Sequence, residues 1–181
     1  MIDQDFFIEG SFIPWYNYKI IEFLNKQNLK NLEIFEFGCG YSTLFYAQKS
    51  KFVTSIESRF EWQEKILNLA ELNNLSNLKI TLHNKLFGVD FASSIKVQDR
   101  NFDLIVCDSF DRVNCVRNSL QKVSNDGVIL LDNSERDKYQ IIFKEMLDLN
   151  WYSITFSDLG PCRIKPSSST IFYKKYNILN L

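Results

Sequence analysis

The sequence of 181 residues predicts an α/β fold: a doubly wound, mostly parallel sheet of seven strands that ends in an antiparallel C-terminal edge hairpin. Short apolar runs rich in β-formers alternate with segments whose apolar residues recur at helical spacing, and this alternation is typical of βαβ units. The last two strand-like runs have no helix between them, so we expect them to pair antiparallel. The length fits one domain with a sizeable core.

Seven runs carry the strand prediction, and short polar links separate them from the expected helices. The strands are expected at Leu32 to Phe37, Phe52 to Ile56, Leu78 to Leu82, Phe102 to Cys107, Val128 to Leu131, Trp151 to Phe156 and Thr170 to Tyr173. Helices are expected from Pro14 to about Lys26, after a cap at Ser42 or Thr43, from Arg59 to the turn at 73–77, from Arg112 to about Val123, and after a cap at Ser134 with Asp137 behind it. A turn is expected at 124–127, a loop at 158–169, and a surface excursion at 85–100 that contains the turn formers Gly88 and Asp99.

The charge and the apolar content argue against several classes of partner. The formal net charge is -1, so the whole chain has no field that attracts polyanions, and free nucleic acid is not an expected partner. No apolar run approaches membrane-spanning length, and Asp3 and Asp5 stand where a signal peptide needs positive charge. We therefore expect a cytoplasmic protein that does not bind membranes.

The cysteines give an indication of the compartment. The four cysteines, Cys39, Cys107, Cys115 and Cys162, show no C-x-x-C spacing. Cys39 and Cys107 lie in or beside apolar strand-like runs. Buried thiols in a reducing compartment are therefore expected, rather than disulfides or a zinc site.

The stretch from Leu32 to Thr43 is the centre of the predicted fold. Its apolar strand runs to Phe37 and stops at Gly38, and Gly40 follows two residues later. Glycines at these positions let the backbone turn tightly and approach a ligand closely. A strand, a glycine turn and a helix in this order build a nucleotide-type site at the carboxyl end of a sheet.

Two details of this stretch distinguish between nucleotides. Thr43 stands where a dinucleotide-binding G-x-G-x-x-G motif needs its third glycine. Glu36 completes a Glu36-x-Gly38-x-Gly40 pattern that resembles the first motif of class I S-adenosylmethionine-dependent methyltransferases. The resemblance covers roughly residues 30–174 and implies the Rossmann-like sheet of that family. Runs such as Phe-Gly-Cys-Gly-Tyr-Ser-Thr are also similar to those of small bacterial proteins of this class.

The resemblance implies a set of cofactor-binding residues. In that family the glycines pass under the methionine part of the cofactor and the acid lies beside it. Glu57, at the end of the second strand, matches the acid that binds the ribose, where a carboxylate accepts both hydrogen bonds of a vicinal diol. Asn84 matches the residue that contacts the adenine amino group. The full expected set is Glu36, Gly38, Gly40, Ser42, Glu57, Asn84 and Asp108.

Polar side chains gather where the expected strands end, and ligands of such sheets bind beyond those ends. Asp108 follows the fourth strand and Asp132-Asn133 the fifth, and these residues resemble the metal ligands of catechol-type O-methyltransferases. The resemblance implies a divalent cation such as Mg²⁺, which would bind substrate hydroxyl oxygens and lower their pKa. One alternative is a turn with a helix cap at Asp132-Asn133-Ser134. Another is a metal-free general base, Asp108 or His83, although a lone histidine is more often structural.

Two further segments have two interpretations each. Asp111-Arg112 forms a local ion pair or binds a substrate carboxylate through the two-pronged donor geometry of arginine. Residues 1–30 form a leading helix packed on the sheet, or a lid over the active site of the kind found in methyltransferases that this chain resembles. We expect a single domain over 1–181 with its Rossmann-like core at 31–174.

The expected function is S-adenosylmethionine-dependent methylation, with an oxygen of a small molecule or sugar-containing metabolite as the acceptor. Transfer from a sulfonium is an in-line displacement, so the enzyme mainly holds donor and acceptor in line. A nicotinamide-dependent oxidoreductase is one alternative, against which Thr43 and the lack of a Tyr-x-x-x-Lys pair argue. The other is a non-catalytic module that binds S-adenosylmethionine without turnover. The oligomeric state is not predicted.

Overall fold

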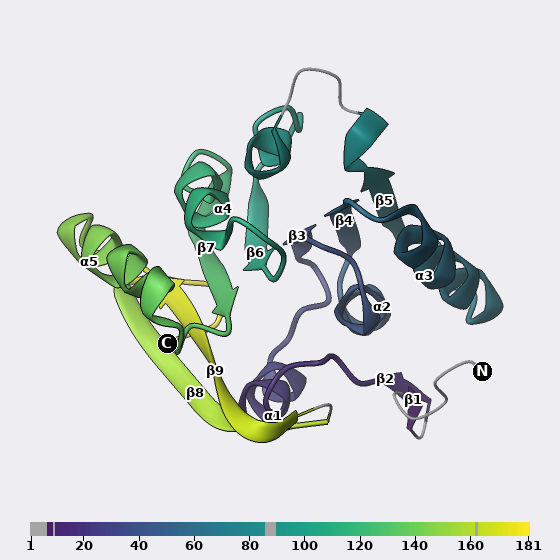
Figure 1. Cartoon of the computed structure of the whole chain (residues 1–181), viewed down its shortest axis with the longest axis horizontal. Helices are drawn as coiled ribbons and strands as arrows, with labels where there is room; N and C mark the ends of the chain where they lie inside the picture. The colour runs from purple at the N-terminus through teal and green to yellow at the C-terminus, as the bar shows by residue number, and fades with distance from the viewer. Residues whose placement is uncertain (1–6, 9, 86–89, 162) are drawn as a thin grey trace.

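The computed structural model describes residues 7–8, 10–85, 90–161 and 163–181 (Figure 1). The expected turn former Gly88, the thiol of Cys162 and the first six residues of the N-terminal segment lie outside the described residues. In the described part of the chain, seven strands form one sheet in the order β5-β4-β3-β6-β7-β9-β8. Their bounds are β3 (Glu33–Phe37), β4 (Phe52–Glu57), β5 (Leu78–Leu82), β6 (Phe102–Cys107), β7 (Val123–Asp132), β8 (Tyr152–Gly160) and β9 (Arg163–Tyr173).

The sheet is parallel from β5 through β7 and antiparallel at its C-terminal edge. β3 pairs in parallel with β4 on one side and with β6 on the other, whereas β9 pairs antiparallel with both β7 and β8. The chain therefore winds outward from β3 to β5, crosses back to β6, and winds outward in the opposite direction. This arrangement confirms the predicted doubly wound sheet with its edge hairpin. Open α/β sheets bind ligands at such a reversal of strand order.

Helices cover both faces of the sheet (Figure 1). One face carries α1 (Tyr18–Lys26), α2 (Tyr41–Lys49) and α3 (Phe60–Leu72), and the other carries α4 (Arg112–Ser119), α5 (Gln140–Asp148) and the 3₁₀ turn η3 (Phe91–Ile95). Each face has its own hydrophobic core. Successive residues of a strand point to opposite faces, so Ile34 packs in the core on the side of α1, α2 and α3, and Phe35 packs in the core on the side of α4 and α5. Shorter described elements are the ribbon β1 (Phe7–Ile8) and β2 (Ser11–Phe12) and the 3₁₀ turns η2 (His83–Lys85) and η4 (Asp137–Tyr139).

The first helix begins later than predicted. α1 starts at Tyr18 rather than at Pro14, because Asn17 is its N-cap. The Asn17 Oδ1 atom accepts a hydrogen bond from the backbone N–H of Ile20 at 3.1 Å. Trp15 therefore precedes the helix and lies in an irregular stretch, free of the helical spacing that the sequence suggested.

The last helix also begins later, and the predicted cap at Ser134 is wrong. α5 starts at Gln140, after the 3₁₀ turn η4. Ser134 is buried, and its hydroxyl accepts a hydrogen bond from Thr170 Oγ1 at 2.8 Å. The residue that matched a capping pattern therefore joins β9 to the end of β7 instead.

The helix predicted to reach Val123 ends at Ser119. Val123 begins β7 and pairs with Phe102 of β6. The turn expected at 124–127 lies inside β7 as an irregularity, because the next paired residue of that strand is Val128. Val123 continues the helical spacing of the preceding apolar residues by coincidence, although it is the first residue of a strand. Periodicity alone does not distinguish these two cases.

The surface excursion expected at 85–100 is wrong in its middle. Within η3, Phe91 is 4% exposed and Ile95 is fully buried. Asp90 caps this turn by accepting a hydrogen bond from the backbone N–H of Ser93 at 2.9 Å. The ring of Phe91 lies 6.0 Å from that of Phe37, so this short turn covers part of the α4 side of the sheet. A single turn is too short to show a helical period in the sequence.

The edge hairpin is longer than predicted, and the loop expected at 158–169 is largely strand. Ser157 pairs with Ser168, and their hydroxyl oxygens lie 2.6 Å apart. Pro166 is tolerated because the pairing is irregular between Asp158 and Gly160. Serines on both strands hid this extension, since they lower the apolar content from which strands are predicted.

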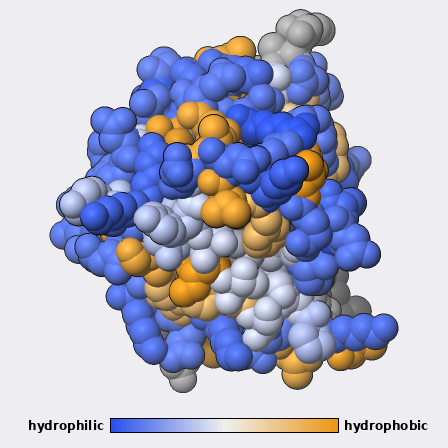
Figure 2. Space-filling view, turned by 90° about the vertical axis from the view of Figure 1, so that its left-hand side faces the viewer, coloured by the Kyte–Doolittle hydropathy of each residue, from blue (hydrophilic) through white to orange (hydrophobic). Residues whose placement is uncertain are grey.

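The hairpin and α5 form one outer face of the molecule. Figure 2 shows that apolar groups on this side form several clusters, with hydrophilic and intermediate groups between and around them. Exposed side chains of this region include Leu147, Leu149 and Tyr152. In the described part of the chain, no helix combines the length and the apolar character that crossing a membrane requires.

Candidate functional site

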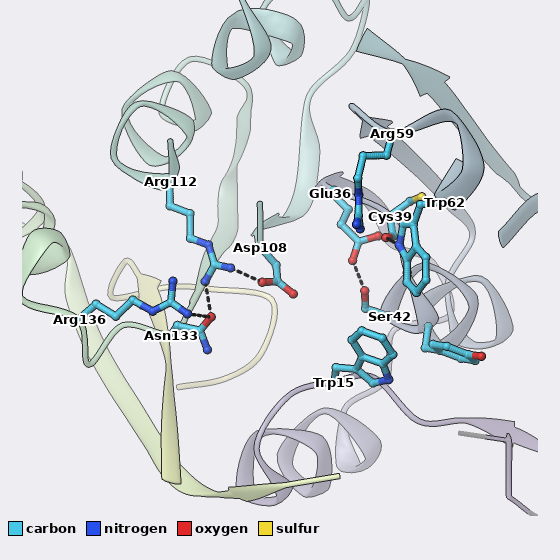
Figure 3. A pocket seen from close by; sticks show the side chains of 13 residues that line it. Trp15, Glu36, Cys39, Ser42, Arg59, Trp62, Asp108, Arg112, Asn133 and Arg136 are labelled. Atoms are coloured by element: carbon cyan, nitrogen blue, oxygen red, sulfur yellow. Dashed lines mark hydrogen bonds and ion pairs between the residues drawn. The ribbon is translucent and has the colours of Figure 1, made fainter. Parts of the chain in front are cut away.

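A cavity of about 310 Å³ opens at the carboxyl ends of β3, β6 and β7. It lies at the reversal of strand order, between two walls of different chemistry (Figure 3). The first wall contains the glycine turn and aromatic side chains: Trp15, Glu36, Gly38, Cys39, Gly40, Tyr41, Ser42, Arg59 and Trp62. The second wall contains Asp108, Arg112, Asn133 and Arg136.

The glycine turn is shaped by its contact with the end of β6. Gly38 has a φ of +93°, a left-handed conformation that side chains rarely adopt. A Cβ atom at this position would lie 3.1 Å from the backbone oxygen of Asp108. The N–H of Gly38 donates to the carbonyl of Ile56 at 2.8 Å, which holds the turn against β4. Gly38 is therefore required both by its backbone angle and by the close approach of a neighbouring strand.

Glu36 is a buried acid held by hydroxyl groups. It is 1% exposed, and the hydroxyls of Ser42 and Thr43 each donate to one of its carboxylate oxygens. Ser55 Oγ donates to Oε2 at 3.1 Å. Burial raises the pKa of Glu36 from 4.5 to about 7, although the three hydroxyl hydrogen bonds act in the opposite direction. This side chain is therefore poised to change its charge near neutral pH.

The start of α2 differs from the predicted cap at Ser42 or Thr43. Gly40 is the N-cap, and its N–H donates to Thr43 Oγ1 at 2.9 Å. Because Ser42 and Thr43 both donate to Glu36, their hydroxyls link the helix to β3. Thr43, which stands where a dinucleotide-binding motif has its third glycine, therefore has a structural role of its own.

Glu57 stands behind the first wall. It is 5% exposed, and its Oε2 accepts from the N–H of Cys39 at 3.0 Å. Its Oε1 accepts from the N–H groups of Ser58 and Arg59 at 2.7 and 2.9 Å. The carboxylate therefore fixes the glycine turn and the start of α3 relative to each other. Its predicted contact with a ribose stays a prediction.

Three aromatic rings form much of the first wall. The ring of Trp15 lies 5.8 Å from that of Tyr41 in a stacked arrangement and 5.6 Å from that of Trp62. The indole N–H of Trp62 donates to the carbonyl of Cys39 and thereby holds the glycine turn. The guanidinium of Arg59 lies 5.4 Å from the Trp62 ring. The N-terminal segment thus supplies the side chain of Trp15 to the cavity.

Arg112 lies at the centre of the second wall and contacts three strand ends or turns. Its Nη2 donates to Asp108 Oδ1 at 2.6 Å, and its Nε donates to the carbonyl of Ser109 at 2.7 Å. Its Nη1 donates to Asn133 Oδ1 at 3.0 Å and to the carbonyl of Asp132. The Asp132 Oδ2 atom lies 3.9 Å from the same nitrogen. This guanidinium joins the end of β6 to the end of β7 (Figure 3).

The end of β7 is fixed by further polar contacts. Asp132 is 1% exposed and accepts from Ser169 Oγ at 2.6 Å. Asn133 follows with a φ of +52°, and its Oδ1 accepts a second hydrogen bond from Arg136 Nη2 at 3.1 Å. One amide oxygen therefore receives two arginine donors.

The residues predicted to bind a metal come together, but their arrangement does not fit a divalent cation. Asp108, Asp132 and Asn133 all face the guanidinium of Arg112. Oxygen ligands of Mg²⁺ or Ca²⁺ lie about 2.0–2.6 Å from the ion, so an ion bound to these oxygens would overlap the guanidinium. In the ranges that the structure describes, no group of three or more His, Cys, Asp or Glu side chains is arranged for a metal.

Two other predicted residues lie apart from this cavity. His83 and Asn84 follow β5 in η2, and neither is among the described residues that line the cavity. The ring of His83 meets that of Phe91 edge-on at 5.5 Å, and Asn84 is exposed. Their predicted roles as base and adenine contact therefore gain no support from the cavity and stay predictions.

Sequence reasoning left several lining residues without a place in the site, among them Trp15, Arg59 and Arg136. Trp15 was expected on a helix, Arg59 only as the start of one, and Arg136 in no functional role. The one sequence signal that could have placed Arg136 in the site is its position four residues after the strand end at Asp132. The cysteines Cys39 and Cys107 are buried thiols, as is Cys115.

No protein-family model matches the sequence, and no curated protein matches it. Several solved structures share its fold. The O-methyltransferase TomG from Streptomyces achromogenes, solved with S-adenosylmethionine, has a TM-score of 0.65 and 16% identity, and the match covers 86% of this chain and 76% of that one. An O-methyltransferase from Bacillus cereus, solved with S-adenosylhomocysteine, has a TM-score of 0.64 and 17% identity over 86% of this chain and 78% of that one.

An rRNA methylase from Streptococcus thermophilus has the same fold. Its TM-score is 0.66 at 14% identity, and the match covers 87% of this chain and 95% of the methylase. At such identities the likeness concerns the fold, in which these proteins share a mostly parallel sheet flanked by helices. The two O-methyltransferases and the rRNA methylase thus combine one fold with different named activities, so the chemistry of this chain has to be argued from its own cavity.

Proposed function

We propose that this chain, which has the fold of class I S-adenosylmethionine-dependent methyltransferases, transfers a methyl group from S-adenosylmethionine to a small-molecule acceptor. One observation carries the proposal: the cavity opens beside a glycine turn and a buried acid at the reversal of strand order. Solved proteins of this fold hold S-adenosylmethionine or S-adenosylhomocysteine.

The first wall suits the charge of the donor. S-adenosylmethionine carries an ammonium and a sulfonium, and both are attracted to a carboxylate or to aromatic faces. Glu36 supplies the carboxylate, and Trp15 and Trp62 supply the faces. Gly38 and Gly40 leave room for the donor to approach the backbone. In this proposal Ser42 acts by orienting Glu36, and Glu57 binds the ribose beyond Cys39.

The second wall suits the acceptor. Asp108 lines the cavity and faces the first wall, and Arg112 holds one of its carboxylate oxygens. In the proposed reaction an acceptor hydroxyl loses its proton to Asp108, and the oxygen attacks the methyl carbon. The carbon–sulfur bond breaks, its electron pair stays on sulfur, and S-adenosylhomocysteine leaves. This assignment gives O-methylation and makes Asp108, rather than His83, the base.

The size of the site and its two walls favour a small acceptor. The cavity of about 310 Å³ is bounded by the aromatic wall on one side and the arginine wall on the other. The net charge of -1 gives the chain no general attraction for nucleic acid. A cytoplasmic location and the absence of a nucleic-acid substrate belong to this proposal.

Isothermal titration calorimetry tests the donor. We expect saturable one-to-one binding of S-adenosylmethionine and S-adenosylhomocysteine, and no heat from NAD. Binding of NAD instead would favour the oxidoreductase alternative. If no donor binds at about 1 mM, the proposal is wrong. Binding of S-adenosylmethionine without methylation of any compound in a panel of hydroxylated metabolites would favour the non-catalytic module.

The variant Asp108→Asn tests the base. General-base catalysis typically contributes 10²–10⁴-fold, so we expect kcat to fall by at least about 100-fold with little change in donor affinity. Asp111→Asn is the matched control, because Asp111 is exposed three residues further on and its carboxylate contacts Asn114. Equal activity of the two variants would contradict the role given to Asp108.

A further inference from the structure

Arg112 is a buried cation surrounded by oxygen atoms. It is 6% exposed, and three of its nitrogens donate to oxygens of Asp108, Ser109, Asp132 and Asn133. These oxygens come from the ends of two neighbouring strands, β6 and β7, and from the turn after β6. They converge on one point, where the guanidinium stands.

The cation at this point is held from several sides. A second side of the guanidinium meets the ring of Tyr139, whose centroid lies 5.9 Å away. The carboxylates of Asp108 and Asp132 outweigh the effect of burial and raise the pKa of Arg112, so the group stays charged. Without this charge, two carboxylates and an amide oxygen would face one another in a partly buried space, which is costly.

A divalent metal would need the same position. Asp108 Oδ1 and Asn133 Oδ1 lie 2.6 and 3.0 Å from guanidinium nitrogens, within the distances of direct hydrogen bonds. A metal ion bound to both oxygens could be accommodated only after the guanidinium had left. The oxygen cluster and the cation are therefore one unit, with arginine in the place that a metal ion would take.

We propose that Arg112 is the resident cation of this site: it fills the position of a divalent metal, excludes such metals, and positions Asp108 at the cavity wall. In relation to the reaction, and resting on the proposed function, this makes methyl transfer independent of added metal. Arg112 is thus a positioning residue, and its removal should uncover a metal site that the unaltered chain does not offer.

Thermal unfolding with Mg²⁺, Mn²⁺ or Ca²⁺ tests the proposal without any use of the donor. We expect no change in the Tm of the unaltered chain. Arg112→Ala keeps the oxygens and removes the cation, so its Tm should rise with metal concentration, by roughly 4 °C at ten times the dissociation constant. The double variant Arg112→Ala with Asp108→Asn should lose most of this rise, because a neutral amide replaces one of the two carboxylates.

Arg117→Ala is the matched control, because Arg117 lies on the same helix but is exposed and paired with Glu145 at 2.9 Å. Its Tm should stay insensitive to metals. Arg112→Lys retains a positive charge and should also stay insensitive. An Arg112→Ala protein that is folded by circular dichroism yet ignores all three metals would overturn the proposal.

Calorimetry on the unaltered chain decides the matter even if Arg112→Ala does not fold. Titration with Mn²⁺ should give no saturable heat. Saturable binding that Asp132→Asn abolishes would show that a metal displaces the guanidinium, and the proposal would then be wrong. If S-adenosylmethionine fails to bind, the proposed function falls, but the metal titrations still test the role of Arg112.

Discussion

Burial of the Glu36 carboxyl group opposes its ionisation. The free energy of unfolding should therefore depend on pH. The folded-state pKa of Glu36 is about 7, against 4.5 for an ordinary glutamate, so the folded protein binds this proton more tightly than the unfolded chain does. The resulting stabilisation is fully present below pH 4.5 and is lost as the pH rises through 7. We expect the free energy of unfolding to fall by about 2 kcal/mol between pH 5 and 7.5 from this group alone.

Urea denaturation of the unaltered chain and of Glu36→Gln at both pH values isolates this contribution. The other ionisable groups are common to both proteins and cancel in the difference. Glu36→Gln should therefore lack about 2 kcal/mol of the pH-dependent loss. Parallel pH profiles of the two proteins would contradict the raised pKa.

Gly38 and Gly10 separate the cost of a backbone angle from the cost of a close contact. Both have positive φ, at +93° and +82°, but a Cβ on Gly10 meets nothing within 4 Å, whereas one on Gly38 meets the Asp108 backbone at 3.1 Å. Each change to alanine should cost about 1 kcal/mol for the angle. Gly38→Ala should cost more and also weaken donor binding, as measured by denaturation and calorimetry; equal costs would argue against the contact.

The same residues show what a sequence reveals at this scale. Glu36 and Gly38 belong to a short local pattern, so their proximity could be predicted from spacing. For Arg112 the sequence left two interpretations open, a local ion pair with Asp111 or a site for a substrate carboxylate. Its contacts with Asp108 and Asn133 depend on the adjacency of β6 and β7 in the folded sheet. The side chain of Arg112 competes with a metal for the same oxygens, and no local pattern records which of the two prevails.

At the scale of elements, strand interiors were predicted well and element ends poorly. The apolar run Phe102–Cys107 marks β6 because both faces of that strand are buried. The ends depend on tertiary contacts: Ser134 bonds Thr170 instead of capping a helix, and Asn17 caps α1 three residues beyond Pro14. Propensity favours several starting points, and contacts distant in sequence choose among them.

The contact between β8 and the N-terminal segment gives a prediction at this scale. Asn17 Nδ2 donates to the carbonyl of Phe156 at 3.0 Å, and a Cβ on Gly160 would lie 2.5 Å from the backbone oxygen of Tyr16. Gly160→Ala should push this segment outward and move Trp15 in the cavity wall. We expect a loss of about 1–3 kcal/mol in stability and weaker donor binding.

Gly127→Ala is the control for this effect. A Cβ on Gly127 would also be crowded, at 2.7 Å from Val123 Cγ2, but Gly127 lies far along β7 from the cavity end at Asp132. It should lower stability without changing donor affinity at a temperature where both variants are folded. Unchanged affinity in Gly160→Ala would show that the segment does not shape the cavity, and tryptophan fluorescence would report the same result.

At the scale of the whole molecule, the cavity joins parts of the chain that are far apart in sequence. Trp15 comes from the N-terminal segment, Glu36 from the first half of the sheet, and Asp108 and Arg136 from the second half (Figure 3). The seven-stranded plan could be predicted because strand and helix patterns alternate along the whole chain. The pairing of the two walls could not, since their side chains meet only after the sheet has formed.

A ligand that binds the folded chain but not the unfolded chain should stabilise the molecule as a whole. At 100 times its dissociation constant, S-adenosylmethionine would add about 2.7 kcal/mol, which corresponds to a rise in Tm of roughly 5–10 °C for a chain of this size. Differential scanning calorimetry at several donor concentrations measures this shift, with adenosine as the comparison that lacks the methionine part. Because Glu36 and the glycine turn are assigned to that part, adenosine should stabilise much less. Equal shifts for the two compounds would mean that the first wall does not bind methionine, and a shift with NAD alone would favour a nicotinamide site.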